Sequence, residues 1–173
     1  MNNIRIIIIA VLTFIISMVT ASPVLAQVSL PYTTDLIIDG RETVTDVGDV
    51  TMNAYGMLTF EIDEAGTAWR LAETRVYVGD EPPVKVRPDD FPYAHEGLAG
   101  EVSDVFYLDL RAFDLNGDGI VYITARAELT NPTDVNAGSK RPRITTETAL
   151  IQGEESIGKG KNRTTFFAVT VSG

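Results

Sequence analysis

Oxygen-bearing side chains recur at alternate positions between residues 114 and 119, a segment that reads Asp-Leu-Asn-Gly-Asp-Gly. Asp114, Asn116 and Asp118 match the first half of a calcium-binding loop, in which carboxylate and amide oxygens are followed by a turn-forming glycine. The second half is missing, because the twelfth position of such a loop is Ala125 here rather than a bidentate glutamate. Asn-Gly and Asp-Gly also favour tight hairpin turns. We therefore favour a plain β-hairpin at 114–119, and a Ca²⁺ site at these three residues is the alternative.

The calcium hypothesis needs further ligands from elsewhere in the chain. Carboxylates from other loops could complete such a site, and the acids best placed to do so are Asp80-Glu81 and Asp89-Asp90. Their simpler interpretation is solvated charge on a loop. Calcium is the only cofactor that the sequence suggests.

Catalytic chemistry has few candidates in this chain. There is no cysteine, and His95 is the only histidine, so thiolate nucleophiles, cysteine-bound zinc and histidine-rich metal sites are excluded. No Ser-His-Asp spacing or Gly-x-Ser-x-Gly motif surrounds His95. We predict that the protein is not an enzyme. A secreted glycan-active enzyme stays as a minor alternative, because its paired carboxylates are defined by their spatial separation.

Several aromatic side chains lie in or near the proline-containing stretch from Gly79 to Gly100. Together with the lone histidine they are Trp69, Tyr77, Phe91, Tyr93 and His95. Flat aromatic rings could form a platform that stacks on sugar rings, which would indicate a carbohydrate-binding module. Large aromatics more commonly fill a core or brace a loop, and we expect that role for these residues.

The first 26 residues predict a secretory signal peptide. Arg5 is their only charged side chain, an apolar run follows from Ile6 to Val19, and 21–26 ends in small or apolar residues at a cleavage position. The alternative is a membrane-spanning helix, which needs about 20 apolar residues. We therefore expect cleavage after Ala26, a secreted or cell-surface location, and no membrane insertion after cleavage.

Removal of residues 1–26 would leave 27–173 as a single acidic domain. The formal charge of the chain is −10; residues 27–118 sum to −13, residues 119–173 to +2, and Arg5 adds the remaining +1. Such a balance disfavours nucleic acid and anionic lipid as partners, because both require a positive surface. It is compatible with solubility, with cation binding, or with contacts between acidic and basic surfaces of neighbouring copies.

Period-two alternation of apolar and polar residues dominates the chain after residue 26. It predicts strands at 57–63, 105–113, 120–129 and 165–171, and a further strand at 69–78 that is interrupted by a bulge near Ala72-Glu73. The stretches 79–100 and 131–142 are predicted to be irregular. One shared core should contain Leu58, Phe60, Ile62, Phe106, Leu108, Leu110, Val121, Ile123, Phe167 and Val169. With frequent turn signals, the pattern indicates an all-β fold, an antiparallel two-sheet β-sandwich of immunoglobulin-like or jelly-roll-like type.

Four runs of sequence support the same class. They read Thr-Ala-Trp-Arg-Leu-Ala-Glu-Thr-Arg-Val-Tyr-Val-Gly at 67–79, Asp-Phe-Pro-Tyr-Ala-His-Glu at 90–96, Val-Tyr-Ile-Thr-Ala-Arg-Ala at 121–127 and Glu-Thr-Ala-Leu-Ile-Gln-Gly at 147–153. In this order they resemble an uncharacterised β-sandwich module of prokaryotic secreted and cell-surface proteins. Arg75 and Arg126 stand where that module usually has histidines, and Leu150 and Arg163 where it has tryptophans. Any binding role of those histidines and tryptophans is therefore not carried over.

These observations predict an exported, non-catalytic module with a structural or adhesive role at the cell surface or in the extracellular matrix. Its partner would be a protein or a glycan, including other copies of itself. A calcium-assisted carbohydrate-binding module is the first alternative. The uncharged segment 27–34 is the part that we expect to reach a neighbouring copy, because an extended strand can add to the exposed edge of another sheet.

Overall fold

The computed structural model describes residues 27–40, 43–65, 67–83, 87, 90–135, 144–157 and 164–171. This part of the chain is all-β, which confirms the coarser part of the predicted fold class, and contains one short 3-10 helix, η2 (Leu110–Phe113). No helix in these ranges is long and apolar enough to cross a membrane. The predicted signal peptide at 1–26 lies outside the described residues, as does Asp89.

The described residues form eleven strands. They are β1 (Gln27–Val28), β2 (Tyr32–Asp39), β3 (Val44–Met52), β4 (Met57–Ile62), β5 (Arg70–Gly79), β6 (Tyr93–Glu101), β7 (Ser103–Tyr107), β8 (Ile120–Val135), β9 (Ile144–Ile151), β10 (Glu155–Ile157) and β11 (Thr164–Thr170). All strands pair antiparallel except β1, which runs parallel to β11. The sheet is therefore mixed and not purely antiparallel as predicted, because β1 follows β11 in the same direction.

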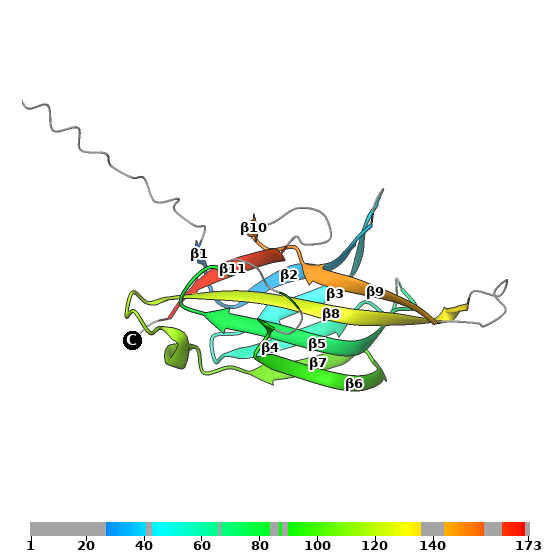
Figure 1. The fold of residues 1–173 in the computed structure, drawn as a ribbon, viewed down its shortest axis with the longest axis horizontal. Coiled ribbons are helices and arrows are strands. Elements are labelled where there is room, and N and C mark those ends of the chain that lie inside the picture. Colours follow the sequence, from blue (N-terminus) through cyan, green and yellow to red (C-terminus); the bar gives the residue numbers. More distant parts are fainter. Residues whose placement is uncertain are drawn as a thin grey trace, which may run out of the picture.

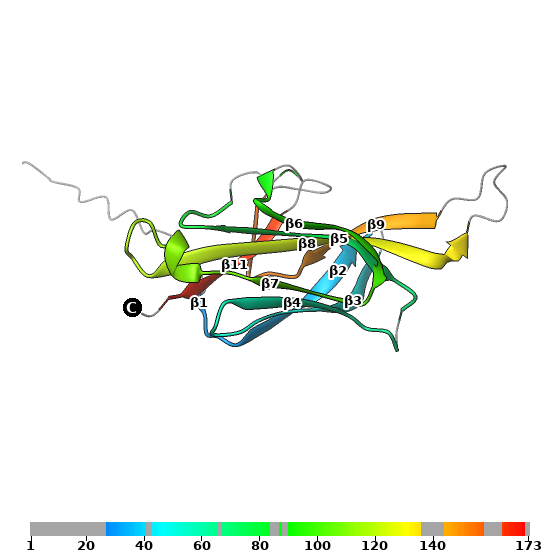
Figure 2. The ribbon, with the colours of Figure 1, turned by 90° about the horizontal axis from the view of Figure 1, so that it is seen from below.

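The strands form one continuous hydrogen-bonded sheet, in the order β1-β11-β8-β9-β2-β3-β4-β7, with β5 and β6 added at the other side of β8 and β10 added to β11. The joint between β9 and β2 consists of only two register pairs, Leu36 with Ile151 and Ile37 with Leu150. The sheet turns at this joint, so that β2, β3 and β4 lie across the core from β5, β6 and β8 (Figures 1 and 2). The sheet does not close, because β6 pairs only with β5 and β7 only with β4.

A single large apolar core lies between the two arms of this sheet. Every residue that the alternation assigned to the core is in it, from fully buried Leu58 and Phe60 to Leu110, which is 7% exposed. The prediction holds because successive strand side chains point to opposite faces, so the apolar set of each strand shares one side. The predicted bulge is also confirmed, since the register of β5 shifts between Leu71 and Glu73.

Three local predictions were wrong. The strand predicted at 105–113 ends at Tyr107, and the chain turns into η2, although Leu108 and Leu110 stay buried. The stretch 79–100 is not irregular throughout, because 93–101 forms the edge strand β6, where Gly97 and Gly100 adopt positive φ and weaken the sequence signal. Segment 131–142 starts as strand too, since β8 continues to Val135.

Segment 27–34, which we expect to reach a neighbouring copy, consists of two parts in the structure. Gln27 and Val28 lie on an edge and pair with the molecule's own β11. Tyr32, Thr33 and Thr34, however, begin β2, which is paired with β3 inside the sheet. Only the residues before Tyr32 lie outside β2.

Candidate functional site

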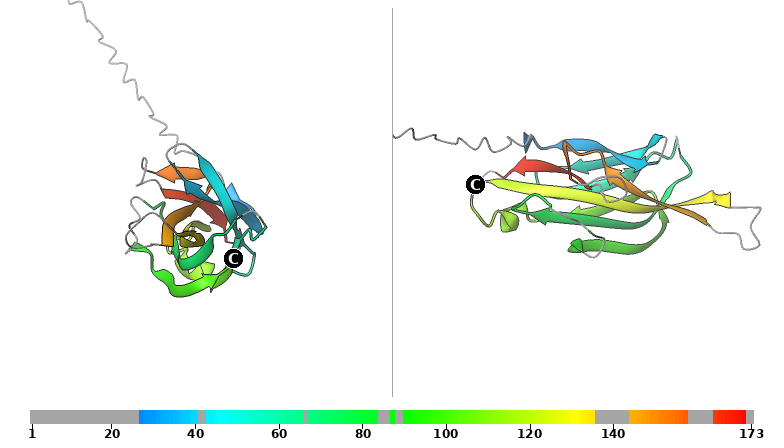
Figure 3. Two further views of the ribbon diagram at one scale, coloured as in Figure 1. Left: turned by 90° about the vertical axis from the view of Figure 1, so that its right-hand side faces the viewer. Right: turned by 45° about the horizontal axis from the view of Figure 1, so that its top comes forward.

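The strands β1 and β11 run side by side at one end of the molecule (Figure 3). An open groove lies at this end. It has a volume of about 970 Å³ and is lined by four segments, 27–30, 54–56, 107–111 and 170–171. These segments belong to the N-terminal edge, the β3–β4 turn, the β7–η2 connection and the end of β11. Because they are far apart in the sequence, only the folded topology brings them together.

Exposed aromatic rings gather at this groove. Large apolar side chains that stay exposed in the described chain are Val44, Tyr55, Tyr107 and Leu115. Tyr55 is 94% exposed and Tyr107 is 80% exposed, and both line the groove. Neither was predicted as a site residue. The sequence contains one indication of this exposure: an aromatic residue in the short turn Asn53-Ala54-Tyr55-Gly56 has few neighbours to pack against.

The β3–β4 turn that carries Tyr55 is held by local hydrogen bonds. The side-chain oxygen of Asn53 accepts from the backbone N–H of Tyr55 at 2.9 Å and from that of Met57 at 3.0 Å. Gly56 has φ +82°, and a Cβ at this position would lie 1.9 Å from the carbonyl oxygen of Leu108. The N–H of Leu108 donates to the carbonyl of Gly56 at 2.8 Å. Two walls of the groove are thus fixed to each other through their backbones.

Polar groups complete the groove. Its charged side chains are Asp109 and Arg111, one of each sign. On the opposite wall, the hydroxyl of Thr170 donates to the side-chain oxygen of Gln27 at 3.0 Å. The side-chain amide nitrogen of Gln27 carries two N–H donors. The groove therefore combines exposed aromatic rings with both donors and acceptors.

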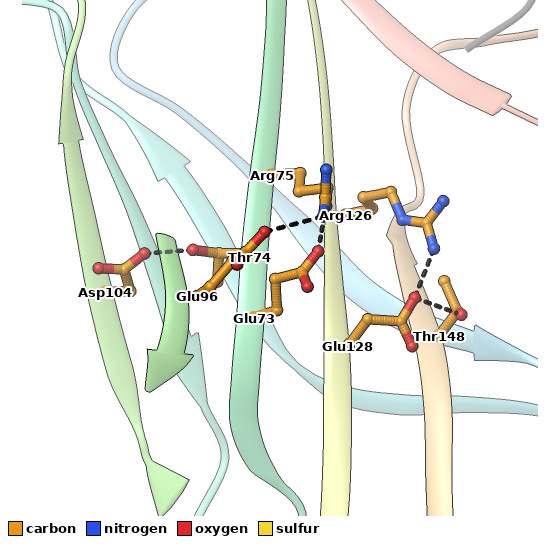
Figure 4. A network of polar contacts seen from close by, with 8 residues as sticks. All are labelled: Glu73, Thr74, Arg75, Glu96, Asp104, Arg126, Glu128 and Thr148. Carbon is orange, nitrogen blue, oxygen red and sulfur yellow. Dashed lines mark hydrogen bonds and ion pairs between the residues drawn. The ribbon is translucent and has the colours of Figure 1, made fainter. Parts of the chain in front are cut away.

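A second polar cluster covers the outer face of β5, β8 and β9 (Figure 4). Arg75 and Arg126 lie directly opposite each other in register, and so do Glu73 and Glu128. Each arginine pairs with the glutamate of its own strand, Arg75 with Glu73 and Arg126 with Glu128. The cost of placing like charges opposite each other is therefore offset along the strands.

The side chain of Phe91, which precedes β6, lies against Arg126 of this cluster. The Phe91 ring is 7% exposed, and the Arg126 guanidinium carbon lies 5.9 Å from its centroid. The hydroxyl of Thr148 donates to Glu128 at 2.9 Å, whereas the buried Nε of Arg126 has no hydrogen-bond partner in the described chain. Arg75 and Arg126 thus both take part in internal ion pairs.

A third polar group bridges the open side of the sheet between β6 and β7. Asp104 accepts hydrogen bonds from the buried Thr74 hydroxyl and from Nδ1 of His95, which is 2.9 Å from both carboxylate oxygens. The His95 ring stacks on Phe106 with 4.1 Å between centroids and an interplanar angle of 8°. These side-chain contacts connect the unpaired edges of β6 and β7, and they give His95 a bracing position.

The predicted aromatic residues lie on two sides of the sheet. Tyr93 is opposite Val76 in register, packs against the core and meets Phe113 edge-on at 6.0 Å. Trp69 also packs against the core. Tyr77 lies on the outer face, where its hydroxyl donates to the carbonyl of Glu81 at 3.4 Å. Burial, followed by the charges of Asp80 and Glu81, raises the pKa of Tyr77.

The predicted calcium loop has a different geometry from the favoured hairpin. It connects η2 to β8, and β7 is paired with β4, so no hairpin joins β7 to β8. The side-chain oxygens of this loop accept hydrogen bonds from its own backbone. Asp114 accepts from the N–H of Gly119, and Asn116 accepts from the N–H of Asp118. Asp118 accepts from the N–H of Ile120 at 2.8 Å. No group of three or more His, Asp or Glu side chains in the described ranges is placed to hold a metal ion.

An exposed row of acids crosses β2, β3 and β4. Asp35 lies opposite Asp49, and Asp49 lies opposite Glu61. Burial, followed by repulsion from neighbouring carboxylates of which Asp46 is the strongest, raises the pKa of Asp49. The −13 balance of residues 27–118 is thus partly concentrated on one sheet face.

Comparison with known proteins identifies no relative. No protein-family model, no curated protein and no solved structure matches this chain. The functional conclusions therefore depend on the residues and geometry described above.

Proposed function

We propose that this chain is an exported, non-catalytic module that acts through surface contact at the cell surface or in the extracellular matrix, with a structural or adhesive role. Its partner is a protein or a glycan of that environment. The proposed architecture is a two-layer sandwich, in which the turn of the sheet at the β9–β2 joint separates β2, β3, β4 and β7 from the remaining strands.

One contrast carries this proposal. The arginine and histidine side chains that could take part in catalysis are engaged in contacts within the sheet, whereas two aromatic rings are left exposed to solvent. Arg75, Arg126 and His95 form ion pairs and hydrogen bonds with acids of the same sheet. These contacts hold strands together and brace the open side of the sheet. The exposed aromatic rings lie at the open end groove instead. Exposed aromatic surface rimmed by polar groups is typical of binding sites.

The proposed location is supported by the order of charged, apolar and small residues in 1–26. The absence of cysteine is compatible with export, because the apolar core supplies stability without disulfides. Contact between copies would use the edge at 27–31 and not the whole of 27–34, since Tyr32 to Thr34 are part of β2.

Fractionation of the producing cells tests this proposal. We expect most of the chain in the envelope or matrix fraction, with its N-terminus at Gln27, and rebinding of purified chain to envelope material from cells that lack it. A deletion of 27–30, which leaves β2 intact, would measure the contribution of the edge segment. Purely cytoplasmic recovery, or turnover of a polysaccharide by the purified chain, would contradict the proposal.

A further inference from the structure

We infer that the end groove is a saccharide-binding site for an uncharged oligosaccharide, with Tyr55 and Tyr107 as its stacking residues. This inference rests on the proposed function, because it names the ligand class through which the module would contact its surroundings. It differs from the platform predicted from the sequence, whose aromatic residues pack in the core or on the outer face of β5.

Exposure of the two tyrosines is the first argument. In a folded domain a ring that is 80% or 94% exposed contributes little to the core. One face of a pyranose ring presents C–H groups, so its burial on an aromatic ring removes apolar surface of both from water. Tyrosine suits this role, because its rigid ring loses little conformational entropy on binding and its hydroxyl can still bond to water or ligand.

The composition of the groove is the second argument. Sugar hydroxyls both donate and accept hydrogen bonds, and the groove offers both through Gln27, Asp109 and Arg111. The charges of Asp109 and Arg111 cancel, and the chain as a whole carries −10. An anionic polymer would be repelled by the molecule, whereas a neutral sugar chain would not. An uncharged ligand with many hydroxyls fits these conditions best.

Preorganisation is the third argument. The turn that carries Tyr55 is fixed by the two Asn53 hydrogen bonds, and the backbone of Gly56 is locked against Leu108, one residue from Tyr107. Binding then requires little ordering of the protein, which lowers the entropic cost of association. The groove has a volume of about 970 Å³, which is enough for a short oligosaccharide and far more than a single small ion needs.

A glycan array that includes neutral and acidic oligosaccharides tests the inference, followed by titration of each hit with NMR detection on the purified chain. We expect a neutral glycan to bind and to shift amide signals within 54–56, 107–111 and 170–171. Tyr55→Ala and Tyr107→Ala should each weaken binding by at least about tenfold, as loss of one stacked ring typically does. Tyr55→Phe, which keeps the ring, should stay within about threefold of the wild type by the same reasoning.

Leu115→Ala provides the matched control. Leu115 is 79% exposed and lies outside the groove, so its truncation should leave glycan binding unchanged. Absence of glycan binding, binding that survives both tyrosine substitutions, or groove shifts caused by peptides instead of sugars would overturn the inference. If the chain is still retained on the envelope in those cases, the proposed function stands and only the ligand class fails.

Discussion

The acid row on β2, β3 and β4 predicts that neutralising Asp49 stabilises the fold. Asp49 has a carboxylate directly opposite it on each neighbouring strand, Asp35 on β2 and Glu61 on β4. Like charges in this position repel each other across the strands. Burial, followed by repulsion from Asp46, Asp35 and Glu61, raises the pKa of Asp49, so the folded state disfavours its ionised form. Asp49→Asn keeps the size and polarity of the side chain and removes the charge.

The expected magnitude follows from the two pairs. One directly opposed pair changes stability by about 0.2–1 kcal/mol, so two pairs would give about 0.4–2 kcal/mol before screening. Solvent reduces this at an exposed position, and we expect Asp49→Asn to raise the free energy of unfolding at pH 7 by about 0.5–1 kcal/mol at low salt. Because the folded pKa is raised, the gain should vanish as the pH falls below the ordinary range of Asp.

Urea unfolding at pH 7, at low salt and at about 1 M NaCl, measures this effect. The gain should shrink strongly at the higher salt, where the screening length falls to about 3 Å. Glu101→Gln is the control, because Glu101 is an exposed acid on β6 and lies opposite Leu71, outside the row. A loss of stability in Asp49→Asn, or a gain that salt does not change, would refute the reasoning.

Three further predictions concern single side chains. Thr74→Val should lower the free energy of unfolding by about 1.5–3 kcal/mol, because the buried Thr74 hydroxyl donates to the Asp104 carboxylate. Thr33→Val, at an exposed position, should cost much less. Equal losses of the two variants in urea unfolding would contradict the prediction. Burial and a hydrogen bond to the Glu154 carboxylate raise the pKa of Tyr32 to about 12. The free energy of unfolding should therefore fall as the pH rises from about 10 to 12, and it should fall less in Tyr32→Phe. Parallel pH curves for the two proteins would argue against the prediction. If calcium binds the 114–119 loop, millimolar CaCl₂ should raise the melting temperature of the wild type but not of Asp118→Asn. That variant removes the charge and keeps an oxygen that can accept from the backbone N–H of Ile120. No shift in the wild type would remove the calcium hypothesis.

The alternation of side chains was sufficient to predict the core, because strand geometry alone decides which face each residue occupies. Phe106, Leu108 and Leu110 are buried even though the strand ends at Tyr107 and η2 follows. Tyr107, Asp109 and Arg111 line the groove, but so do Leu108 and Leu110 from the buried set. The alternation therefore predicted burial and did not single out the groove residues.

The rest of the site depends on pairing between distant segments. Nothing in the local sequence indicates that β1 lies parallel to β11, or that the turn at 54–56 meets the segment after β7. The edge strand β6 was missed because Gly97 and Gly100 interrupt its alternation. The row of like charges was missed for the same reason, because it too depends on pairing between segments. Strand register places Asp35, Asp49 and Glu61 opposite one another, and the whole sheet determines that register.

Two features of this molecule disagree with what stability alone would favour. The acid row places repelling charges in register, and the groove leaves two tyrosine rings in water. Natural chains carry such local conflicts mainly where function requires them. Asp35 and Asp49 do not line the groove, so the two features can be separated experimentally. A variant that is stabilised by Asp49→Asn and still binds through Tyr55 and Tyr107 would assign ligand recognition to the groove, and would show that the acid row is not needed for it.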